Sequence, residues 1–226
     1  MDKYISDVTE LNLGLKINGG SCSHIYEFGD GLYFKKFEED YQDLLDPINE
    51  EFYDVLRYLS SLKGMPYIVR PLDIYRSDNL LFGYSMPIIN AISLRNVSDQ
   101  VLVSDVLSGF KILSSDIRVL ADNYVKTEDV GGDNILFNGF MYLLDLDLSL
   151  VDKRYIPDEL YENTMRSVYC GIKSKILGES RYDDDFSVTD WDKDLTKFRD
   201  RASEYLGYEV MSIGDLKKGY QKIKSI

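Results

Sequence analysis

The first 88 residues contain short apolar runs separated by turn residues, a pattern that predicts β-strands. A Gly-Asp-Gly turn at 29–31 lies between two of these runs. It favours a hairpin, because glycine adopts the positive φ angles that tight turns require. We expect five strands in this part of the chain, at 13–17, 24–28, 31–37, 67–76 and 79–89.

One helix is expected between the third and fourth of these strands. From Pro47 to Leu62 the apolar residues recur every three or four positions, which places them on one face of an α-helix. Lys63-Gly64, followed by Pro66, supplies a stop. Residues 1–88 are therefore predicted to form a five-stranded antiparallel sheet with one amphipathic helix.

Residues 89–226 have a different character, because helical periodicity dominates there. The exception is 134–149, where two short apolar runs around Asn138-Gly139 predict a β-hairpin. A β-rich first part and a mainly helical second part predict an α+β fold with two lobes and a cleft between them. The expected helices lie at about 99–124, 157–177, 190–206 and 212–225.

The composition narrows the possible functions. The chain has 226 residues, 44% of them hydrophobic, which is enough for one substantial core or two modest ones. Its formal net charge of −13 repels phosphate backbones, so nucleic acid is not an expected partner. The N-terminal residues include acids where a signal peptide would be apolar, and no apolar run approaches the roughly 18 residues of a membrane span. We therefore expect a cytoplasmic protein without a membrane partner.

Cysteine and histidine are scarce. Cys22 and Cys170 are far apart in the sequence, so neither a zinc site nor a disulfide framework is expected. His24 is the single histidine, which argues against a Ser-His-Asp site and against a histidine-rich metal centre. We interpret His24 as a strand residue.

The turn between the first two predicted strands contains Gly19, Gly20 and Ser21, and Lys35 follows on the third strand. Small residues let backbone amides approach phosphate oxygens, and a lysine can hold phosphates as a point charge. The same Gly-Gly-Ser sequence is also a common hairpin connection. This feature alone therefore does not distinguish a phosphate-binding turn from an ordinary hairpin. Lys36 should face the opposite side of its strand, so only one of the two lysines can contact such a ligand.

The predicted helix begins with acids that could pair with Lys35. Glu50, Glu51 and Asp54 lie near its start. Acids there are also favoured by the helix dipole, which is the alternative explanation. Glu51 is preferred as the partner because its register matches the apolar face at Val55, and Glu50 is the reserve.

The segment 127–149 concentrates oxygen-bearing side chains around a loop and the predicted hairpin. Asp129 lies in the loop, Asn134 enters the first strand, and Asp145 leaves the second. Such side chains could bind Mg²⁺ that is bridged by nucleotide phosphates. Asp145 follows an apolar run in which a lone carboxylate is costly to bury, and Asp147 should point the same way and add an oxygen. The alternative is a set of turn acids beside an Asn-Gly hairpin.

Together these motifs resemble those of the protein-kinase-like superfamily, over residues 15 to about 175. The chain looks like a divergent bacterial-type member, between eukaryotic-like protein kinases and aminoglycoside or choline kinases. INGGSCSHIY is similar to the glycine-rich loop, YFKKF to the strand that carries the nucleotide lysine, and MPYIVRPLDIY to the segment after the first helix. TEDVGGDN resembles the catalytic loops HRDLKPEN and HGDLHPGN, and YLLDLDLS resembles KLIDFGLA.

The resemblance implies a bilobal kinase fold, with residues 1–88 as the N-lobe and 89–226 as an abbreviated, mainly helical C-lobe. The implied cofactors are ATP and Mg²⁺. The implied nucleotide-binding residues are Gly19, Gly20, Ser21, Lys35 and Glu51, the last as the residue that orients Lys35. The implied catalytic base is Asp129, and the implied metal ligands are Asn134, Asp145 and Asp147.

Several positions depart from the family pattern. Thr127 and Glu128 replace the usual His and Arg of the catalytic loop, and Gly131 stands where protein-serine kinases have a lysine. Only about nine residues, from Ser149 to Pro157, remain for an activation segment. Ser167 lies near the position of the family's anchoring aspartate.

The function predicted on this basis is transfer of the γ-phosphate of ATP to a hydroxyl-bearing acceptor, either a small molecule or a specialised protein. Asn18 and Ser23 stand where the family usually has its first and third glycines. This altered glycine loop and the missing lysine leave a second hypothesis open, a nucleotide-binding pseudokinase that acts as a switch or scaffold. Transfer of a nucleotidyl group on the same fold is a third.

Overall fold

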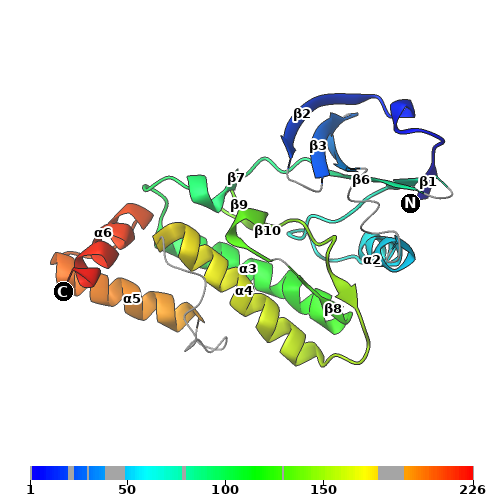
Figure 1. Ribbon diagram of the computed structural model, residues 1–226. Helices are drawn as coiled ribbons and strands as arrows, with labels where there is room; N and C mark the ends of the chain where they lie inside the picture. The colour runs from blue at the N-terminus through cyan, green and yellow to red at the C-terminus, as the bar shows by residue number, and fades with distance from the viewer. Residues whose placement is uncertain are drawn as a thin grey trace. The chain divides into compact units, whose positions relative to one another are not determined.

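The computed structural model describes residues 2–19, 23–29, 31–38, 49–77, 80–128, 130–177 and 191–225 (Figure 1). These residues form an α+β fold, as the sequence predicts. The α-helices in this part of the chain are α2 (Asn49–Ser61), α3 (Val103–Asp122), α4 (Pro157–Leu177), α5 (Trp191–Leu206) and α6 (Ile213–Lys224). The short 3-10 helices are η1 (Val8–Glu10), η2 (Leu94–Asn96) and η3 (Gly132–Asn134).

The chain divides into two compact units. Unit 1 comprises Met1–Gly64, Val69–Asn90 and Asp147–Ser149, and unit 2 comprises Met65–Ile68, Ala91–Leu146 and Leu150–Ile226. Each unit therefore draws on segments that are distant in the sequence. The segment Asp147–Ser149 brings one of the predicted site residues, Asp147, into unit 1.

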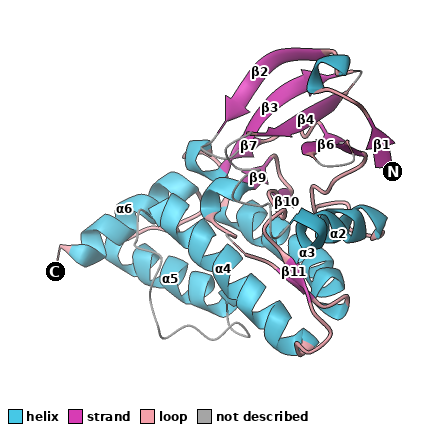
Figure 2. Ribbon diagram, turned by 45° about the vertical axis from the view of Figure 1, so that its right-hand side comes forward, coloured by secondary structure: helices cyan, strands magenta, loops and turns pink. Residues whose placement is uncertain are grey.

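Unit 1 contains a six-stranded sheet with the strand order β1-β5-β6-β4-β3-β2 (Figure 2). All neighbouring strands are antiparallel except β1 and β5, which are parallel. The strands are β1 (Asp2–Tyr4), β2 (Leu13–Gly19), β3 (Ser23–Phe28), β4 (Leu32–Phe37), β5 (Ile74–Arg76) and β6 (Leu81–Pro87).

The predicted five-stranded antiparallel sheet is therefore wrong: the sheet has a sixth strand and is mixed. β1 pairs in parallel with β5, with Asp2 opposite Ile74. The three residues of β1, DKY, have no apolar alternation, so the pattern that reveals the other strands is missing. The strand expected at 67–76 is also shorter, since Pro71 has no N–H to donate to a ladder and β5 begins only at Ile74.

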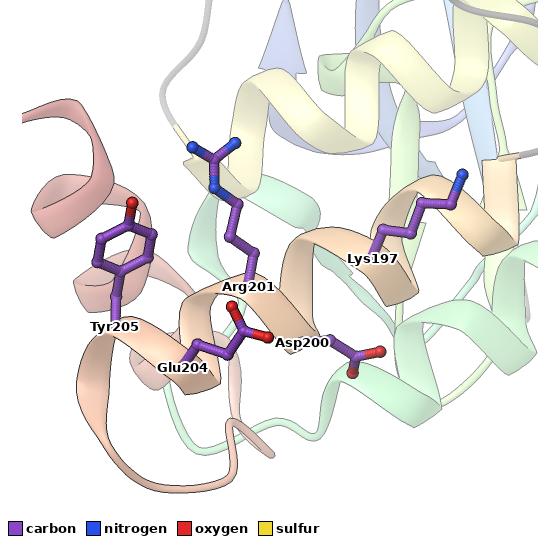
Figure 3. A pocket seen from close by; sticks show the side chains of 5 residues that line it. All are labelled: Lys197, Asp200, Arg201, Glu204 and Tyr205. Carbon is purple, nitrogen blue, oxygen red and sulfur yellow. The ribbon is translucent and has the colours of Figure 1, made fainter.

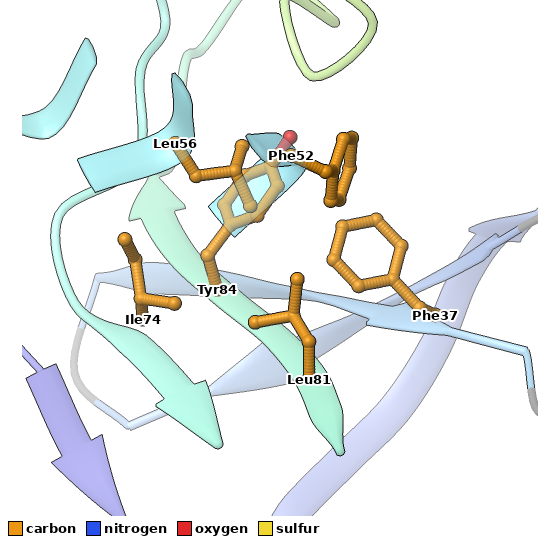
Figure 4. Close-up of a cluster of buried hydrophobic side chains, with 6 residues drawn as sticks. All are labelled: Phe37, Phe52, Leu56, Ile74, Leu81 and Tyr84. Atoms are coloured by element: carbon orange, nitrogen blue, oxygen red, sulfur yellow. The ribbon is translucent and has the colours of Figure 1, made fainter. Parts of the chain in front are cut away.

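Helix α2 packs on one face of this sheet through a buried apolar cluster. The cluster consists of Phe37, Phe52, Leu56, Ile74, Leu81 and Tyr84 (Figure 4). The ring of Phe37 contacts those of Phe52 and Tyr84, with centroids 5.5 and 5.9 Å apart. Full burial of one such side chain contributes about 1.5–3 kcal/mol. The apolar spacing that predicts α2 from the sequence is thus also what attaches the helix to β4, β5 and β6.

In unit 2 the long helices α3 and α4 lie side by side, and α5 pairs with α6 (Figure 1). The α5–α6 contact is close at Gly219, where an added Cβ would lie 2.5 Å from Cβ of Ala202. The predicted hairpin around Asn138-Gly139 is confirmed: β9 and β10 are antiparallel, and Gly139 has φ of 101°. The short strands of this unit are β7 (Ile92–Ser93), β8 (Val125–Lys126), β9 (Ile135–Phe137), β10 (Met141–Leu143) and β11 (Leu150–Val151).

The mainly helical character predicted for the second part of the chain is confirmed. The helices expected at 157–177 and 212–225 match α4 and α6 closely, whereas α3 begins at Val103, later than expected. Of the helices that the structure describes, none combines the length and the apolar character that a bilayer crossing requires.

Candidate functional site

Lys35 lies on β4, on the face of the sheet that carries the apolar cluster. Side chains alternate along a strand, so Lys35 and Phe37 share this face and Lys36 points to the other. Across the sheet, Lys35 is paired with Ile25 of β3 and Tyr84 of β6. Lys35 is only 6% exposed. An ammonium group buried in these surroundings is stable only with a charged or hydrogen-bonding partner.

Asp147 provides that partner. Nζ of Lys35 donates a hydrogen bond to Oδ2 of Asp147 at 2.9 Å, and the two side chains are 8% and 7% exposed. The residues are 112 positions apart in the sequence, and both belong to unit 1. Because the pair is shielded from water, its attraction is stronger than that of an exposed pair at the same distance. The pair therefore fixes the position of the Lys35 ammonium.

The backbone of β6 approaches Lys35 closely at Gly83. Gly83 has φ of 149°, and a Cβ added there would lie 2.0 Å from the carbonyl oxygen of Lys35. No side chain fits at that distance, so a glycine is required. At Gly83 the backbones of β4 and β6 therefore lie in direct contact, with no side chain between them.

The acids on α2 that were predicted to orient Lys35 are either exposed or outside the described side chains. Glu51 is exposed on α2, and the side chain of Glu50 lies outside the described residues. Asp54, the third candidate at the start of the helix, is also exposed. A pairing of Lys35 with Glu51 therefore stays a prediction, whereas the structure shows a contact of Lys35 with Asp147.

The predicted phosphate-binding turn is described only at its beginning. Gly19 is the last residue of β2, and Gly20 and Ser21 lie outside the described residues. A Cβ added at Gly19 would lie 2.4 Å from Nδ1 of His24, which is the residue opposite it on β3. Nε2 of His24 lies 3.2 Å from a carboxylate oxygen of Glu38. These contacts agree with the interpretation of His24 as a strand residue.

In unit 2 the β9–β10 hairpin brings together the backbones of two predicted metal ligands, Asn134 and Asp145. Ile135 is opposite Leu143, and the N–H of Leu144 donates to the carbonyl oxygen of Asn134 at 2.8 Å. Asp145 follows directly after Leu144, so both predicted ligands lie at the open end of the same hairpin. Both are half-buried. The spacing of Asn134 and Asp145 in the sequence therefore does bring their backbones close together in the fold.

Asp145 has an unusual backbone conformation. Its φ of 62° is in the left-handed region, a property it shares with Tyr124 among the described non-glycine residues. Such a conformation costs about 1–3 kcal/mol and is enriched at functional sites. Aspartate tolerates it better than most residues do. The conformation singles out Asp145 independently of any sequence motif.

The donor set at this hairpin suits magnesium. Asn134 offers an amide oxygen and Asp145 a carboxylate, both of them hard oxygen ligands that Mg²⁺ prefers. Magnesium usually takes few protein ligands and completes its coordination with water and phosphate oxygens. Within the described residues, no group of three or more His, Cys, Asp and Glu side chains could hold a metal ion. A magnesium ion bound by Asn134 and Asp145 would leave coordination positions for water and phosphate oxygens.

Thr164 was missed by the sequence analysis. Its hydroxyl lies 2.7 Å from that of Thr127, and Thr164 is 5% exposed on α4. Ser167, the position expected near the family's anchoring residue, is instead exposed. Thr127 lies two residues before the predicted base, Asp129, which is itself outside the described residues. A polar residue within the apolar stripe of α4 was the signal that could have revealed Thr164.

Two hollows of the described surface are lined by residues other than the predicted site residues. One of about 520 Å³ lies along α5, where Lys197 and Arg201 point to the same side of the helix (Figure 3). Its lining combines both signs of charge: Lys197, Asp200, Arg201, Glu204 and Tyr205. Another, of about 350 Å³, is lined by residues 8–13 with Tyr26 and Lys36, on the sheet face opposite Lys35.

A scan against protein-family models finds no family that matches this chain, and a search of curated proteins finds no significant match. Membership of the protein-kinase-like superfamily therefore remains a proposal that rests on the motifs.

Proposed function

We propose that this chain has the bilobal protein-kinase-like fold and transfers the γ-phosphate of ATP to a hydroxyl group. In this proposal Lys35 binds the nucleotide phosphates, Asn134 and Asp145 hold Mg²⁺, and Asp129 accepts or orients the hydroxyl proton. Catalysis would then come mainly from positioning and charge neutralisation, which are the chief requirements of phosphoryl transfer.

The observation that carries the proposal is the buried contact between Lys35 and Asp147. A lysine and an aspartate 112 residues apart are held 2.9 Å from each other, each less than a tenth exposed. Burying such a pair is rarely the most stable solution, because an apolar pair of similar volume is often equal or better. Lys35 is itself a predicted nucleotide-binding residue, so the buried pair supports a functional role for both charges.

The hairpin residues support the metal part of the proposal. Asn134 and Asp145 lie at one end of the β9–β10 hairpin, and Asp145 has a left-handed φ of 62°. When bound, Mg²⁺ would neutralise charge on the phosphates. Both residues have the ligand chemistry that this ion requires.

The acceptor is proposed to be a small molecule or a specialised protein. Only about nine residues, from Ser149 to Pro157, correspond to the segment on which protein kinases bind peptides. An acid at position 147 is also closer to the pattern of small-molecule kinases. Both features favour a compact acceptor over diverse peptides.

A nucleotide-binding pseudokinase is the second candidate. It is favoured by Gly131, which stands where protein-serine kinases have a lysine beside the transferred phosphate. Loss of that charge would weaken stabilisation of the transition state without preventing nucleotide binding. Nucleotidyl transfer is the third candidate, and it predicts a different product.

One experiment separates these functions. The purified protein is incubated with isotope-labelled ATP and Mg²⁺, with candidate small molecules added, and all products are analysed by mass spectrometry. Phosphate-sized adducts are expected for a kinase, AMP-sized adducts for a nucleotidyl transferase, and neither for a pseudokinase. Melting temperature is measured in parallel, because a ligand that binds only the folded state raises it. No rise with millimolar ATP and either Mg²⁺ or Mn²⁺ would remove the nucleotide-binding proposal.

Two substitutions test the assigned roles. Asp129→Ala should leave ATP affinity nearly unchanged and lower turnover by about 100-fold to 10,000-fold, the usual contribution of a general base. Asp145→Ala should weaken both Mg²⁺-ATP binding and turnover, because a metal ligand is lost. If both variants keep the wild-type rate, the observed activity comes from another site or another protein.

A further inference from the structure

We infer that Asp147 is the residue that positions Lys35 for the nucleotide, and that the two acids of the Asp145-Leu146-Asp147 segment have different roles. This inference rests on the proposed nucleotide-binding function. It assigns the metal to Asp145 and the lysine to Asp147.

The geometry around Lys35 points to Asp147. Oδ2 of Asp147 accepts a hydrogen bond from Nζ of Lys35 at 2.9 Å, within the range of a charge-assisted hydrogen bond. The Asp147 side chain is 7% exposed, so solvent hardly screens the contact. Glu51, the acid predicted for this role, is exposed. A partner that is buried with the lysine restrains it far more than a solvated one does.

The neighbours of Lys35 in the sheet are also buried. Phe37, two positions along the same face, is 1% exposed, and Tyr84, opposite Lys35, is 4% exposed. On the backbone side, Gly83 lets β6 approach the carbonyl oxygen of Lys35. Lys35 thus lies among buried neighbours, and Asp147 holds its ammonium group.

The backbone separates the two acids. Asp145 has φ of 62°, belongs to unit 2 and follows the hairpin that carries Asn134. Asp147 belongs to unit 1 and is more deeply buried than Asp145. A carboxylate that neutralises an ammonium has less negative charge to offer a cation. The acid beside Asn134 is therefore the better metal ligand.

The same contact has an opposite interpretation, in which Asp147 competes with the phosphates for Lys35 and blocks nucleotide binding. The two interpretations predict opposite effects of removing the charge. If Asp147 positions Lys35, its removal weakens ATP binding. If Asp147 blocks Lys35, its removal strengthens ATP binding.

The test compares Asp147→Asn with Asp145→Asn and Glu51→Gln by calorimetric titration with ATP, in EDTA and in Mg²⁺. In EDTA, Asp147→Asn should bind ATP about 10-fold to 100-fold more weakly, the loss expected when a charge-assisted hydrogen bond is removed. Adenosine, which has no phosphates, should bind as to the wild type. Asp145→Asn should differ from the wild type mainly in Mg²⁺, and Glu51→Gln should weaken ATP binding less than Asp147→Asn does in both solutions.

The possible results are distinct. Unchanged or tighter ATP binding by Asp147→Asn in EDTA overturns the inference, and so does an equal loss for ATP and adenosine, which indicates general damage. A wild type that binds no ATP at all contradicts the proposed function itself. Should Asp147→Asn fail to fold, Asp147→Glu keeps the charge and changes its reach. That variant should weaken ATP binding in EDTA while its adenosine affinity stays unchanged, and wild-type ATP affinity would overturn the inference.

Discussion

Asp116 is a carboxylate on α3 that is 5% exposed and accepts a hydrogen bond from the backbone N–H of Tyr67 at 2.6 Å. Burial raises its pKa above the ordinary value of 3.8, and the hydrogen bond from Tyr67 lowers it by less. The charged form is thus disfavoured in the folded protein. Asp116 belongs to no predicted site, and its role is to bind the backbone of the segment that precedes β5.

The pH dependence of stability should reveal this carboxylate. Since the folded pKa is raised, the folded state holds a proton that the unfolded chain has released, and the stabilisation is fully present below pH 3.8. It is lost as the pH rises through the raised pKa. The Asp116→Asn variant lacks this titration. Its free energy of unfolding, relative to wild type, should therefore increase with pH over that window, as measured by urea unfolding. A difference that is constant with pH would contradict the assignment.

Gly83 offers a residue-scale test of the support behind Lys35. An alanine there must place Cβ 2.0 Å from the carbonyl oxygen of Lys35, at a φ of 149°. Gly83→Ala should therefore destabilise the protein by about 2–4 kcal/mol, from overpacking and backbone strain. The matched control is Gly31→Ala, with φ of 78° and nothing within 4 Å, which should cost only about 1–2 kcal/mol. Equal losses of free energy in chemical unfolding would show that the close approach at Gly83 is unimportant.

At the scale of elements, the predictable strands are those with a local signal. β3 and β4 have alternating apolar residues and a Gly-Asp-Gly turn between them, and the β9–β10 hairpin has Asn138-Gly139. β1 has neither feature, and its partner β5 lies about seventy residues away. Such a strand forms because the edge of another strand offers unpaired N–H and C=O groups. A local sequence pattern contains no information about that edge.

The same limit applies to the candidate site. Lys35, Asn134 and Asp145 were predicted because each lies at a recognisable position of a strand, turn or hairpin. The contact of Lys35 with Asp147 was not predicted, since several acids were available and local spacing does not rank partners 112 residues apart. The left-handed φ of Asp145 was also not predicted, because aspartate tolerates a positive φ without requiring one.

The contact between α4 and the loop after β8 can be tested with one methyl-for-hydroxyl replacement. Thr164→Val keeps the shape of the side chain but removes the hydroxyl 2.7 Å from that of Thr127. Stability should fall by about 0.5–1.5 kcal/mol, the net value of one hydrogen bond. Ser167→Ala, an exposed position one turn on, should change stability by less than about 0.5 kcal/mol. If the two variants have equal melting temperatures, the Thr127–Thr164 contact does not stabilise the protein.

At the scale of the whole molecule, the compact units are not continuous stretches of the sequence. Unit 1 includes Asp147–Ser149, far from its other segments in the sequence. A cut of the chain after residue 88 would therefore leave Lys35 buried without Asp147, and breaking such a pair typically costs about 3–5 kcal/mol. The predicted N-lobe, 1–88, therefore contains the buried Lys35 but lacks Asp147, the residue that neutralises its charge.

The net charge leads to a prediction for the whole chain. With 39 acidic and 26 basic residues, the folded protein repels itself at neutral pH. Raising the salt concentration from about 0.01 M to about 0.15 M shortens the Debye length from about 30 Å to about 8 Å, so this repulsion is screened. Salt also weakens exposed ion pairs such as Arg118–Asp158, but each of these contributes at most about 1 kcal/mol.

We therefore expect the melting temperature at pH 7 to rise over this salt range in a calorimetric scan. The control is the same scan near pH 4.5, the calculated isoelectric point, where the net repulsion vanishes. There salt should have no effect on the melting temperature or should lower it, because no net repulsion remains for salt to screen while the attractive ion pairs are still weakened. A melting temperature that falls with salt at pH 7 would mean that the ion pairs outweigh the excess of acidic residues, and that the charge of −13 is distributed so as not to oppose folding.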